Sequence, residues 1–125
     1  MILLDSNILI YAHVNSLPQH KAAKAWLDQK LNASAAVGIP WQSILTFARL
    51  VTNPRVFAKP ETISGAWKQI ELWLNCAPVW IPNPTERHRE LFAEILRETS
   101  VTANLLPDAH LAALALEHEI GRAHV

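Results

Sequence analysis

The sequence predicts an α/β fold in which about six helices wrap a short parallel sheet. Three short apolar stretches, at Ile2–Leu4, Ala36–Ile39 and Pro78–Pro82, have the length and composition of buried strands. Two helical segments follow each of them, and such alternation along a chain is typical of a parallel sheet covered by helices. The 125 residues, of which 50% are hydrophobic, are enough for one domain with its own core.

The first strand, Ile2–Leu4, ends directly at Asp5. A run that is apolar on both faces is typical of a central strand in a parallel sheet. Binding sites of open α/β sheets lie beyond the carboxyl ends of the strands, so we expect Asp5 in such a site. Asp is also a preferred N-cap residue, and Asp5 could do no more than cap the helix that Ser6 and Asn7 open.

Six segments have a helical pattern. In most of them apolar residues recur every three or four positions, whereas the last is apolar nearly all round, which indicates a buried helix. The predicted helices are Ile8–Val14, His20–Leu31, Trp41–Thr52, Pro60–Leu74, a fifth helix that Thr85 caps, and Leu105–His118.

A second acid, Asp108, opens the last helix in the segment Leu106-Pro107-Asp108. Because Pro favours the first helical position, Asp108 falls in the first turn, where the helix dipole stabilises a carboxylate. That stabilisation alone could explain Asp108. The other interpretation is that Asp5 and Asp108 meet at one edge of the sheet.

Two carboxylates about 4 Å apart repel by roughly 4 kcal/mol at an effective dielectric of 20. If Asp5 and Asp108 meet, then either one of them is protonated or a divalent cation bridges them. Oxygen ligands without Cys or His favour Mg²⁺ or Mn²⁺ over zinc.

The composition limits the partners that the chain can have. Lys and Arg together number 11, as do Asp and Glu, and this neutrality gives no support to tight nonspecific binding of nucleic acid. Arg49, Arg55 and Lys59 could form a modest patch that faces RNA, or could be simple surface charge. The lone Cys76 cannot form an internal disulfide, and no apolar run approaches the roughly 18 residues of a membrane span, so we expect a cytoplasmic protein without a membrane partner.

Three segments resemble the PIN-domain toxins of the VapC family: MILLDSNILIYA, TFARLVTNPRVF and LLPDAHLAALALEH, in the expected order between Met1 and His118. The resemblance implies an α/β/α sandwich and an endoribonuclease that depends on Mg²⁺, or on Mn²⁺. It also implies a type II toxin–antitoxin system with a small antitoxin as partner, and we expect a homodimer. Asp5 and Asp108 match the metal-binding aspartates of the family, and Asn7 matches the polar residue two positions after the first aspartate.

Two departures from the family pattern affect the expected site. Many members carry a Glu three residues before the Arg of the third helix, where this chain has Thr46 followed by Arg49. Thr can hold a water molecule but supplies no negative charge, so we expect a lower metal affinity. Thr46 and Arg49 are candidate site residues on this basis.

The second departure is the segment 119–125, which leaves the family pattern directly after His118. The family continues there into one more strand and a further acidic motif. We therefore expect residues 1–118 to form the PIN-like domain and 119–125 to be a non-native tail, rather than a natural short end. On this interpretation the sheet lacks its last edge strand, the site lacks at least one acid, and the fragment itself could be inactive.

Two other functions remain open at this point. A non-catalytic PIN-like module would bind an antitoxin in its apolar grooves and lack a working site. A small-molecule α/β hydrolase would have a deep apolar pocket near Asp5 instead of an open acidic groove. His110, two residues after Asp108, points to a different face of its helix, and we expect it to be a partly buried packing residue rather than a general base.

Overall fold

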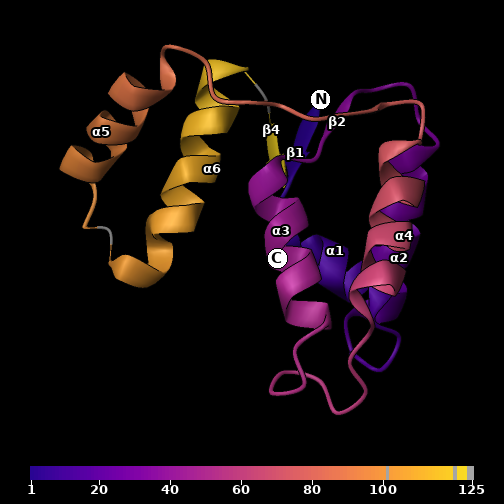
Figure 1. The fold of residues 1–125 in the computed structure, drawn as a ribbon. Helices are drawn as coiled ribbons and strands as arrows, with labels where there is room; N and C mark the ends of the chain where they lie inside the picture. Colours follow the sequence, from indigo (N-terminus) through magenta and orange to yellow (C-terminus); the bar gives the residue numbers. More distant parts are fainter. Residues whose placement is uncertain (101, 120, 124–125) are drawn as a thin grey trace.

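The computed structural model describes residues 1–100, 102–119 and 121–123, and it has the predicted α/β architecture (Figure 1). Its sheet has four strands in the order β3-β2-β1-β4, and every neighbouring pair is parallel. The strands are β1 (Ile2–Leu4), β2 (Val37–Gly38), β3 (Val79–Trp80) and β4 (Gly121–Ala123). β1 therefore lies inside the sheet, as its apolar sequence predicts.

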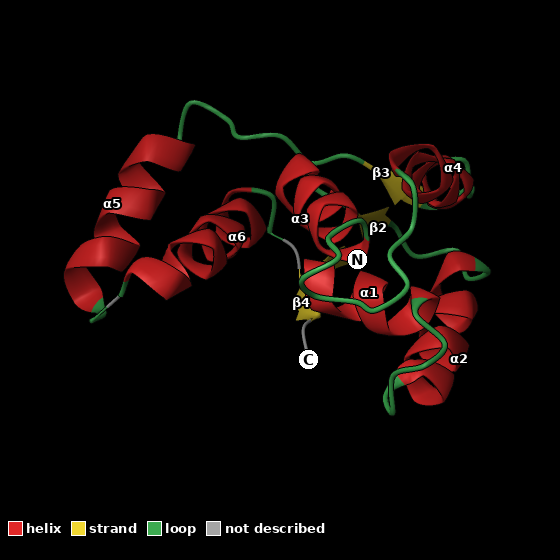
Figure 2. Ribbon diagram, turned by 60° about the horizontal axis from the view of Figure 1, so that its bottom comes forward, coloured by secondary structure: helices red, strands yellow, loops and turns green. Residues whose placement is uncertain are grey.

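The described part of the chain contains six α-helices. α5 and α6 lie together on one side of the molecule, and α2 and α4 lie on the other (Figures 1 and 2). No helix among the described residues has the length and apolar character to cross a membrane. The helices are α1 (Ser6–His13), α2 (His20–Leu31), α3 (Trp41–Val51), α4 (Ile63–Leu74), α5 (His88–Glu98) and α6 (Leu106–Glu117), with a short 3₁₀ turn at Ala103–Leu105.

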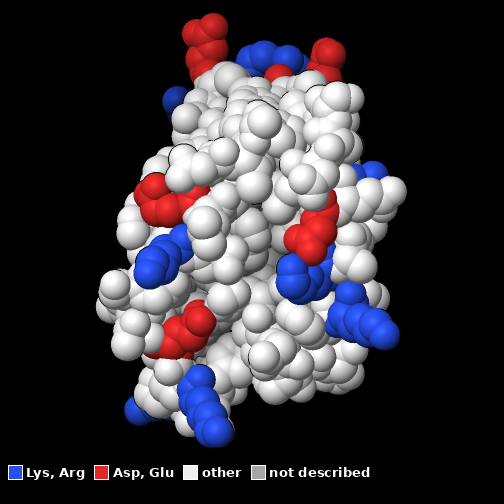
Figure 3. All heavy atoms as spheres, turned by 90° about the vertical axis from the view of Figure 1, so that its right-hand side faces the viewer, with Lys and Arg blue, Asp and Glu red and all other residues white. Residues whose placement is uncertain are grey.

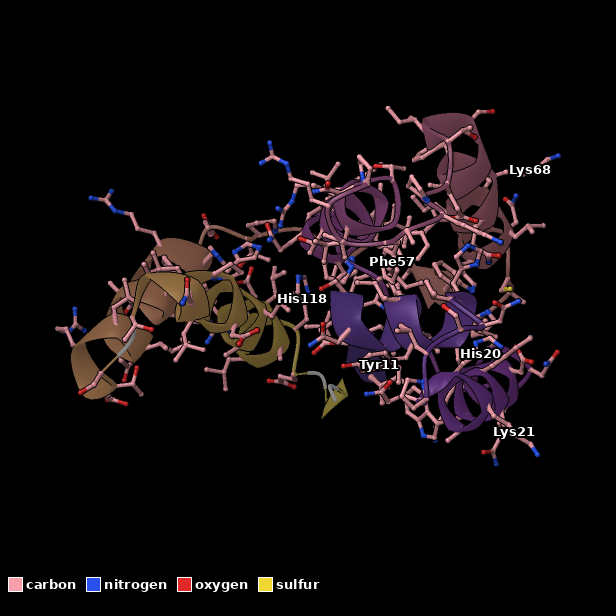
Figure 4. The ribbon with its side chains drawn as sticks, turned by 90° about the horizontal axis from the view of Figure 1, so that it is seen from below. Tyr11, His20, Lys21, Phe57, Lys68 and His118 are labelled. Atoms are coloured by element: carbon pink, nitrogen blue, oxygen red, sulfur yellow. The ribbon has the colours of Figure 1, made fainter. Side chains whose placement is uncertain are left out.

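The larger hydrophobic core lies between the sheet and helices α1 to α4. Leu4 of β1, Leu9 of α1, Phe47 of α3 and Ile70 of α4 are fully buried in it. α1 and α2 also meet through a polar contact, since the His20 ring bonds a backbone carbonyl of α1 at 3.0 Å (Figure 4). The core fixes α1 and α3, the two helices that begin at the carboxyl ends of β1 and β2.

A smaller core lies on the opposite face of β1, under α6. Leu3 packs there with Leu111, Leu114 and Ala115, and Trp80 covers the cluster. Leu3 and Leu4 point to opposite faces because side chains alternate along a strand. β1 is thus covered on both faces, and α6, rich in small alanines, lies directly against it.

The predicted loss of the last edge strand is wrong for this structure. Gly121–Ala123 forms β4 and pairs in parallel with β1, with Ile2 opposite Gly121. Without β4, that side of β1 would present backbone groups without partners, and an extended segment after α6 can reach them. Residues 120, 124 and 125 lie outside the described residues, and the assignment of 119–125 to a non-native tail stays a prediction.

Two predicted helix starts are also wrong. α5 begins at His88, because the Thr85 hydroxyl accepts a bond from the Arg87 amide at 3.2 Å and closes a local turn instead of capping the helix. α4 begins at Ile63, since Thr62 provides the cap through a bond from the Gly65 amide to its hydroxyl at 3.0 Å. In both cases the helix start depends on which backbone amide donates to a Thr hydroxyl.

Candidate active site

Asp5 is fixed at the point where β1 ends and α1 begins. It is only 6% exposed, and its Oδ1 accepts a hydrogen bond from the Ile8 amide at 3.2 Å. The N-cap role is therefore confirmed. The same bond holds the carboxylate at the carboxyl end of the strand, where α/β proteins place their binding sites.

Ser43 ties α3 to the same end of the sheet. Its side chain is buried, at 1% exposure, and its hydroxyl donates to the carbonyl oxygen of Leu4 at 2.7 Å. Leu4 immediately precedes Asp5, so this bond fixes α3, and with it Thr46 and Arg49, relative to the acid. The sequence analysis did not identify Ser43, although a Ser in the first turn of an apolar helix was a signal.

Asp108 comes to this end of the sheet on α6. It lies in the first turn of the helix, next to Pro107, as predicted, and it is exposed to solvent. Leu111, one turn further on, is buried against Leu3 of β1. The packing of Leu111 on Leu3 therefore positions the first turn of α6 near the end of β1.

All the predicted site residues line one small cavity. Its volume is about 110 Å³, and most of its lining residues are polar. This cavity is small and mostly polar, unlike the deep apolar pocket that a small-molecule hydrolase would need. The lining residues are Asp5, Ser6, Asn7, Gln42, Ser43, Thr46, Arg49, Pro107, Asp108 and Leu111.

Gln42 is a further residue of this cavity that the sequence analysis missed. Its amide Nε2 donates to the Thr46 hydroxyl at 3.3 Å, one turn along α3. The Thr46 oxygen therefore acts as an acceptor from Gln42, and the hydroxyl can still donate its own proton. The residue that replaces the expected Glu is thus oriented by a neighbour.

The donor set of the cavity fits a hard divalent cation. Asp5 and Asp108 supply two carboxylates, and Asn7 and Thr46 supply neutral oxygens, while Arg49 adds one positive charge. Mg²⁺ is commonly bound by one or two carboxylates and keeps several waters. Among the described residues no group of three or more His, Cys, Asp or Glu side chains could hold a metal, so a cation here would depend on these two acids.

A partly buried chain of polar side chains joins α6 to α5, and no local sequence pattern predicted it. The enclosed carboxylate of Glu117 accepts bonds from the Thr85 amide and from His88 Nδ1, the latter at 2.6 Å. His88 Nε2 in turn lies 2.9 Å from His110 Nδ1. His110 is half-buried, as expected, but it is part of a hydrogen-bonded chain as well as of the packing. A Glu within an otherwise apolar helix was the signal in the sequence.

The surroundings shift the pKa values of Glu117 and His110 in this polar chain. Enclosure raises the pKa of the Glu117 carboxyl, but the bonds from Thr85 and His88 outweigh it and hold the pKa below the usual 4.5. Burial lowers the pKa of His110 below 6.5, and the adjacent His88 lowers it further. Glu117 is therefore ionised at neutral pH, and His88 donates to it.

The three basic residues Arg49, Arg55 and Lys59 do not share one cavity. Arg49 lines the cavity at Asp5, whereas Lys59 lines a different one of about 680 Å³, beside His13 and Glu61. Arg55 is exposed. Of these cations, Arg49 is the one that lies with the two acids.

A third hollow, of about 530 Å³, lies between α2 and α4. Leu27 and Leu31 of α2 and Leu72 and Trp73 of α4 form much of its apolar lining. Figure 3 faces this side of the molecule and shows acidic and basic side chains close together around a hollow, uncharged middle. This face presents apolar surface between charges of both signs.

The PIN-domain family model matches residues 2–124, and the chain belongs to this family. Within it, the chain belongs to the VapC ribonucleases. It is 39% identical over 118 residues to Ribonuclease VapC37 of Mycobacterium tuberculosis, across 94% of this chain and 82% of that protein. It is 34% identical to VapC ribonuclease Mb2897 of Mycobacterium bovis, across 94% of this chain and 80% of the relative.

Two solved structures share the fold. Mycobacterium tuberculosis VapC20, described as a sarcin-ricin loop cleaving toxin, superposes with a TM-score of 0.68 at 17% identity, over 96% of this chain and 85% of that one. A chain of FitAB bound to an IR36 DNA fragment gives a TM-score of 0.66 at 18% identity, over 99% and 84%. At these identities the likeness concerns the architecture alone.

Proposed function

We infer that this protein is an RNA-cleaving toxin whose active site is the cavity at the end of β1, and that cleavage depends on Mg²⁺, with Mn²⁺ as a substitute. The observation that carries the inference is that Asp5 and Asp108, from opposite ends of the chain, line one small polar cavity. The VapC ribonucleases to which the chain is similar support RNA as the substrate.

Asp5 and Asp108 are the proposed metal ligands. When bound, Mg²⁺ would supply Lewis-acid polarisation of a phosphoryl oxygen and a nucleophilic water at neutral pH. Asp5 suits this role because the α1 cap holds its carboxylate in place. Asp108 suits it because the first turn of α6 brings its carboxylate to the same cavity.

The other cavity residues act on the substrate and on water. Arg49 can bind a phosphate oxygen by a charge-assisted hydrogen bond, which positions the scissile group and offsets charge that develops on it. The Thr46 hydroxyl, which accepts from Gln42, can donate to a water or a phosphoryl oxygen. Asn7 can orient a water or a ligand carboxylate through its amide. Because Thr46 brings no charge, we expect weaker cation binding than with a third acid.

We also propose a small antitoxin as the protein partner, a homodimer as the assembly and the cytoplasm as the compartment. The hollow between α2 and α4, lined by both apolar and polar side chains, suits an amphipathic segment of the antitoxin. The lone Cys76 agrees with a reducing compartment.

The proposal is tested by incubating structured RNA with the protein in Mg²⁺, in EDTA, and with Asp5→Asn. We expect cleavage in Mg²⁺ and its loss in the other two samples, while Asp5→Asn still binds the antitoxin. If the wild type binds the antitoxin but cleaves no RNA in Mg²⁺ or Mn²⁺, the protein is instead a non-catalytic binding module.

A further inference from the structure

The polar chain Glu117–His88–His110 occupies one face of α6. His110 and Glu117 are seven residues, or about two helical turns, apart, so they lie one above the other. Both form hydrogen bonds with His88 at the start of α5, and Glu117 also accepts a hydrogen bond from the Thr85 amide, which precedes that helix. These bonds therefore span about two turns of α6 along its contact with α5.

Asp108 lies on the other side of the same helix. It precedes His110 by two residues, which is about 200° around the helix axis. Leu111, which is next to the face of Asp108, is buried against β1 and lines the cavity. One side of α6 is thus bonded to α5, and the opposite side presents an acid to the cavity.

α5 packs closely against α6, but through side chains that are only partly buried. α5 contains no fully buried residue, and the segment before α6, Thr102–Leu105, is exposed throughout. His118 anchors the far end of α6 through a bond of 2.7 Å to the Asn83 carbonyl. Toward the end that carries Asp108, the bond from His110 to His88 is a directional contact between α6 and α5.

We propose that Glu117, His88 and His110 are positioning residues that fix the rotation of α6 and so place Asp108 for cation binding. This proposal rests on the proposed function. Because a helix with its side chains has a radius of about 5–6 Å, a rotation of 20° would move the carboxylate by roughly 2 Å. Mg²⁺ demands ligands at about 2.0–2.1 Å in near-ideal octahedral geometry, so such a shift would remove a ligand.

The order of hydrogen-bond donors from Glu117 to His110 predicts which substitutions preserve these bonds. A Gln at position 117 can accept from the Thr85 amide with its oxygen and donate to His88 Nδ1 with its nitrogen. His88 then donates from Nε2 to His110 Nδ1, and the chain stays continuous with its direction reversed. A Phe at position 88 can keep the stacked contact with Phe92, whose ring centroid lies 5.9 Å from that of His88. It cannot make the hydrogen bonds to Glu117 and His110.

The test compares wild type, His88→Phe and Glu117→Gln by two measurements. Calorimetric titration gives the Mn²⁺ affinity without any need for cleavage, and amide hydrogen exchange reports the opening of the segment Leu111–Ala113. We expect His88→Phe to weaken Mn²⁺ binding about tenfold, as for other partners that orient metal ligands, and to raise exchange at these amides. Glu117→Gln should stay within about twofold of wild type in Mn²⁺ affinity and in amide exchange, because its hydrogen bonds to Thr85 and His88 remain possible.

Ile70→Val in α4 is the control for a general loss of stability. Ile70 is buried in the larger core, away from α6. We expect this variant to melt at a lower temperature but to keep the wild-type Mn²⁺ affinity and the wild-type exchange at Leu111–Ala113.

The proposal is overturned if His88→Phe keeps either the exchange or the Mn²⁺ affinity of wild type. It is overturned equally if Ile70→Val loses as much Mn²⁺ affinity as His88→Phe does. A wild-type protein that binds no Mn²⁺ would contradict the proposed function itself, and that result is visible before any variant is compared.

Discussion

Asp5 and Asp108 line the same small cavity, although almost the whole chain separates them in sequence. Asp5 reaches the cavity as the cap of α1, and Asp108 reaches it in the first turn of α6, which packs on β1 through Leu111. Both acids are thus placed by helix starts that the strand β1 brings together. In the proposed function, both carboxylates bind one divalent cation in this cavity.

Asp5→Asn should abolish cleavage and leave the fold nearly unchanged. Asn is as good an N-cap residue as Asp, so α1 keeps its start. It lacks the negative charge that a metal ligand provides, and loss of several kcal/mol of metal-assisted stabilisation corresponds to a decrease of roughly 100-fold or more in rate. The measurement is single-turnover RNA cleavage beside a thermal melt.

The control for Asp5→Asn is Asp28→Asn on α2. Asp28 pairs with Lys24 at the surface, and both side chains are more than half exposed. We expect that variant to cleave RNA at the wild-type rate. Equal rates for wild type and Asp5→Asn would exclude Asp5 from the catalytic metal site.

Ser43→Ala should destabilise the protein by about 1–3 kcal/mol. The substitution leaves the buried carbonyl oxygen of Leu4 without its donor, and an unsatisfied buried acceptor carries a cost of this order. Urea unfolding measures the change in the free energy of unfolding. Ser64→Ala, at an exposed position of α4, is the matched control and should change it by less than about 0.5 kcal/mol. An unchanged midpoint for Ser43→Ala would show that the bond to Leu4 contributes nothing.

The advantage of wild type over Glu117→Gln in thermal stability should shrink at acid pH. The pKa of Glu117 is lower in the folded chain than its usual 4.5, so the unfolded chain binds the proton more readily. The stabilisation is complete above that value and is lost as the pH falls below it. Melting curves of both proteins between about pH 7 and pH 3 measure the difference. A difference that is constant, or that grows toward low pH, would contradict the assignment of an ionised Glu117.

Leu72→Asp should weaken binding of the antitoxin without loss of RNA cleavage. Leu72 is 62% exposed and lines the hollow between α2 and α4, so a charge there opposes an apolar segment but leaves the cavity at Asp5 intact. Leu45→Asp on α3 is a control of equal exposure, at 63%, that lies outside the lining of this hollow. The measurement is the dissociation constant of the proposed antitoxin. Tight binding by Leu72→Asp would place the antitoxin elsewhere.

Local sequence patterns predicted the elements whose burial follows a regular period. The apolar run Ile2–Leu4 gave the central strand, and the spacing in His20–Leu31 gave α2 with both of its ends. The position of Asp5 after that run, together with the rule that α/β sites lie at strand ends, predicted the cavity. These predictions depend only on a residue and its near neighbours in the chain.

Contacts between distant residues could not be predicted in the same way. The bond from Ser43 to the Leu4 carbonyl and the chain from Glu117 to His88 depend on how helices pack, which no local period encodes. The fifth helix shows the same limit, because Thr85 had an N-cap sequence but makes a turn whose amide bonds to Glu117. β4 was missed because Gly121–Ala123 is extended by pairing with β1 and not by its own sequence pattern.

The most direct test of the central claim is a calorimetric titration of Mn²⁺ into wild type, Asp5→Asn and Asp108→Asn. If both carboxylates hold one cation, wild type binds Mn²⁺ and each single substitution removes most of that affinity, with the folded state intact by circular dichroism. Wild-type affinity in either variant would show that Asp5 and Asp108 do not share a cation, and the metal site proposed here would be wrong.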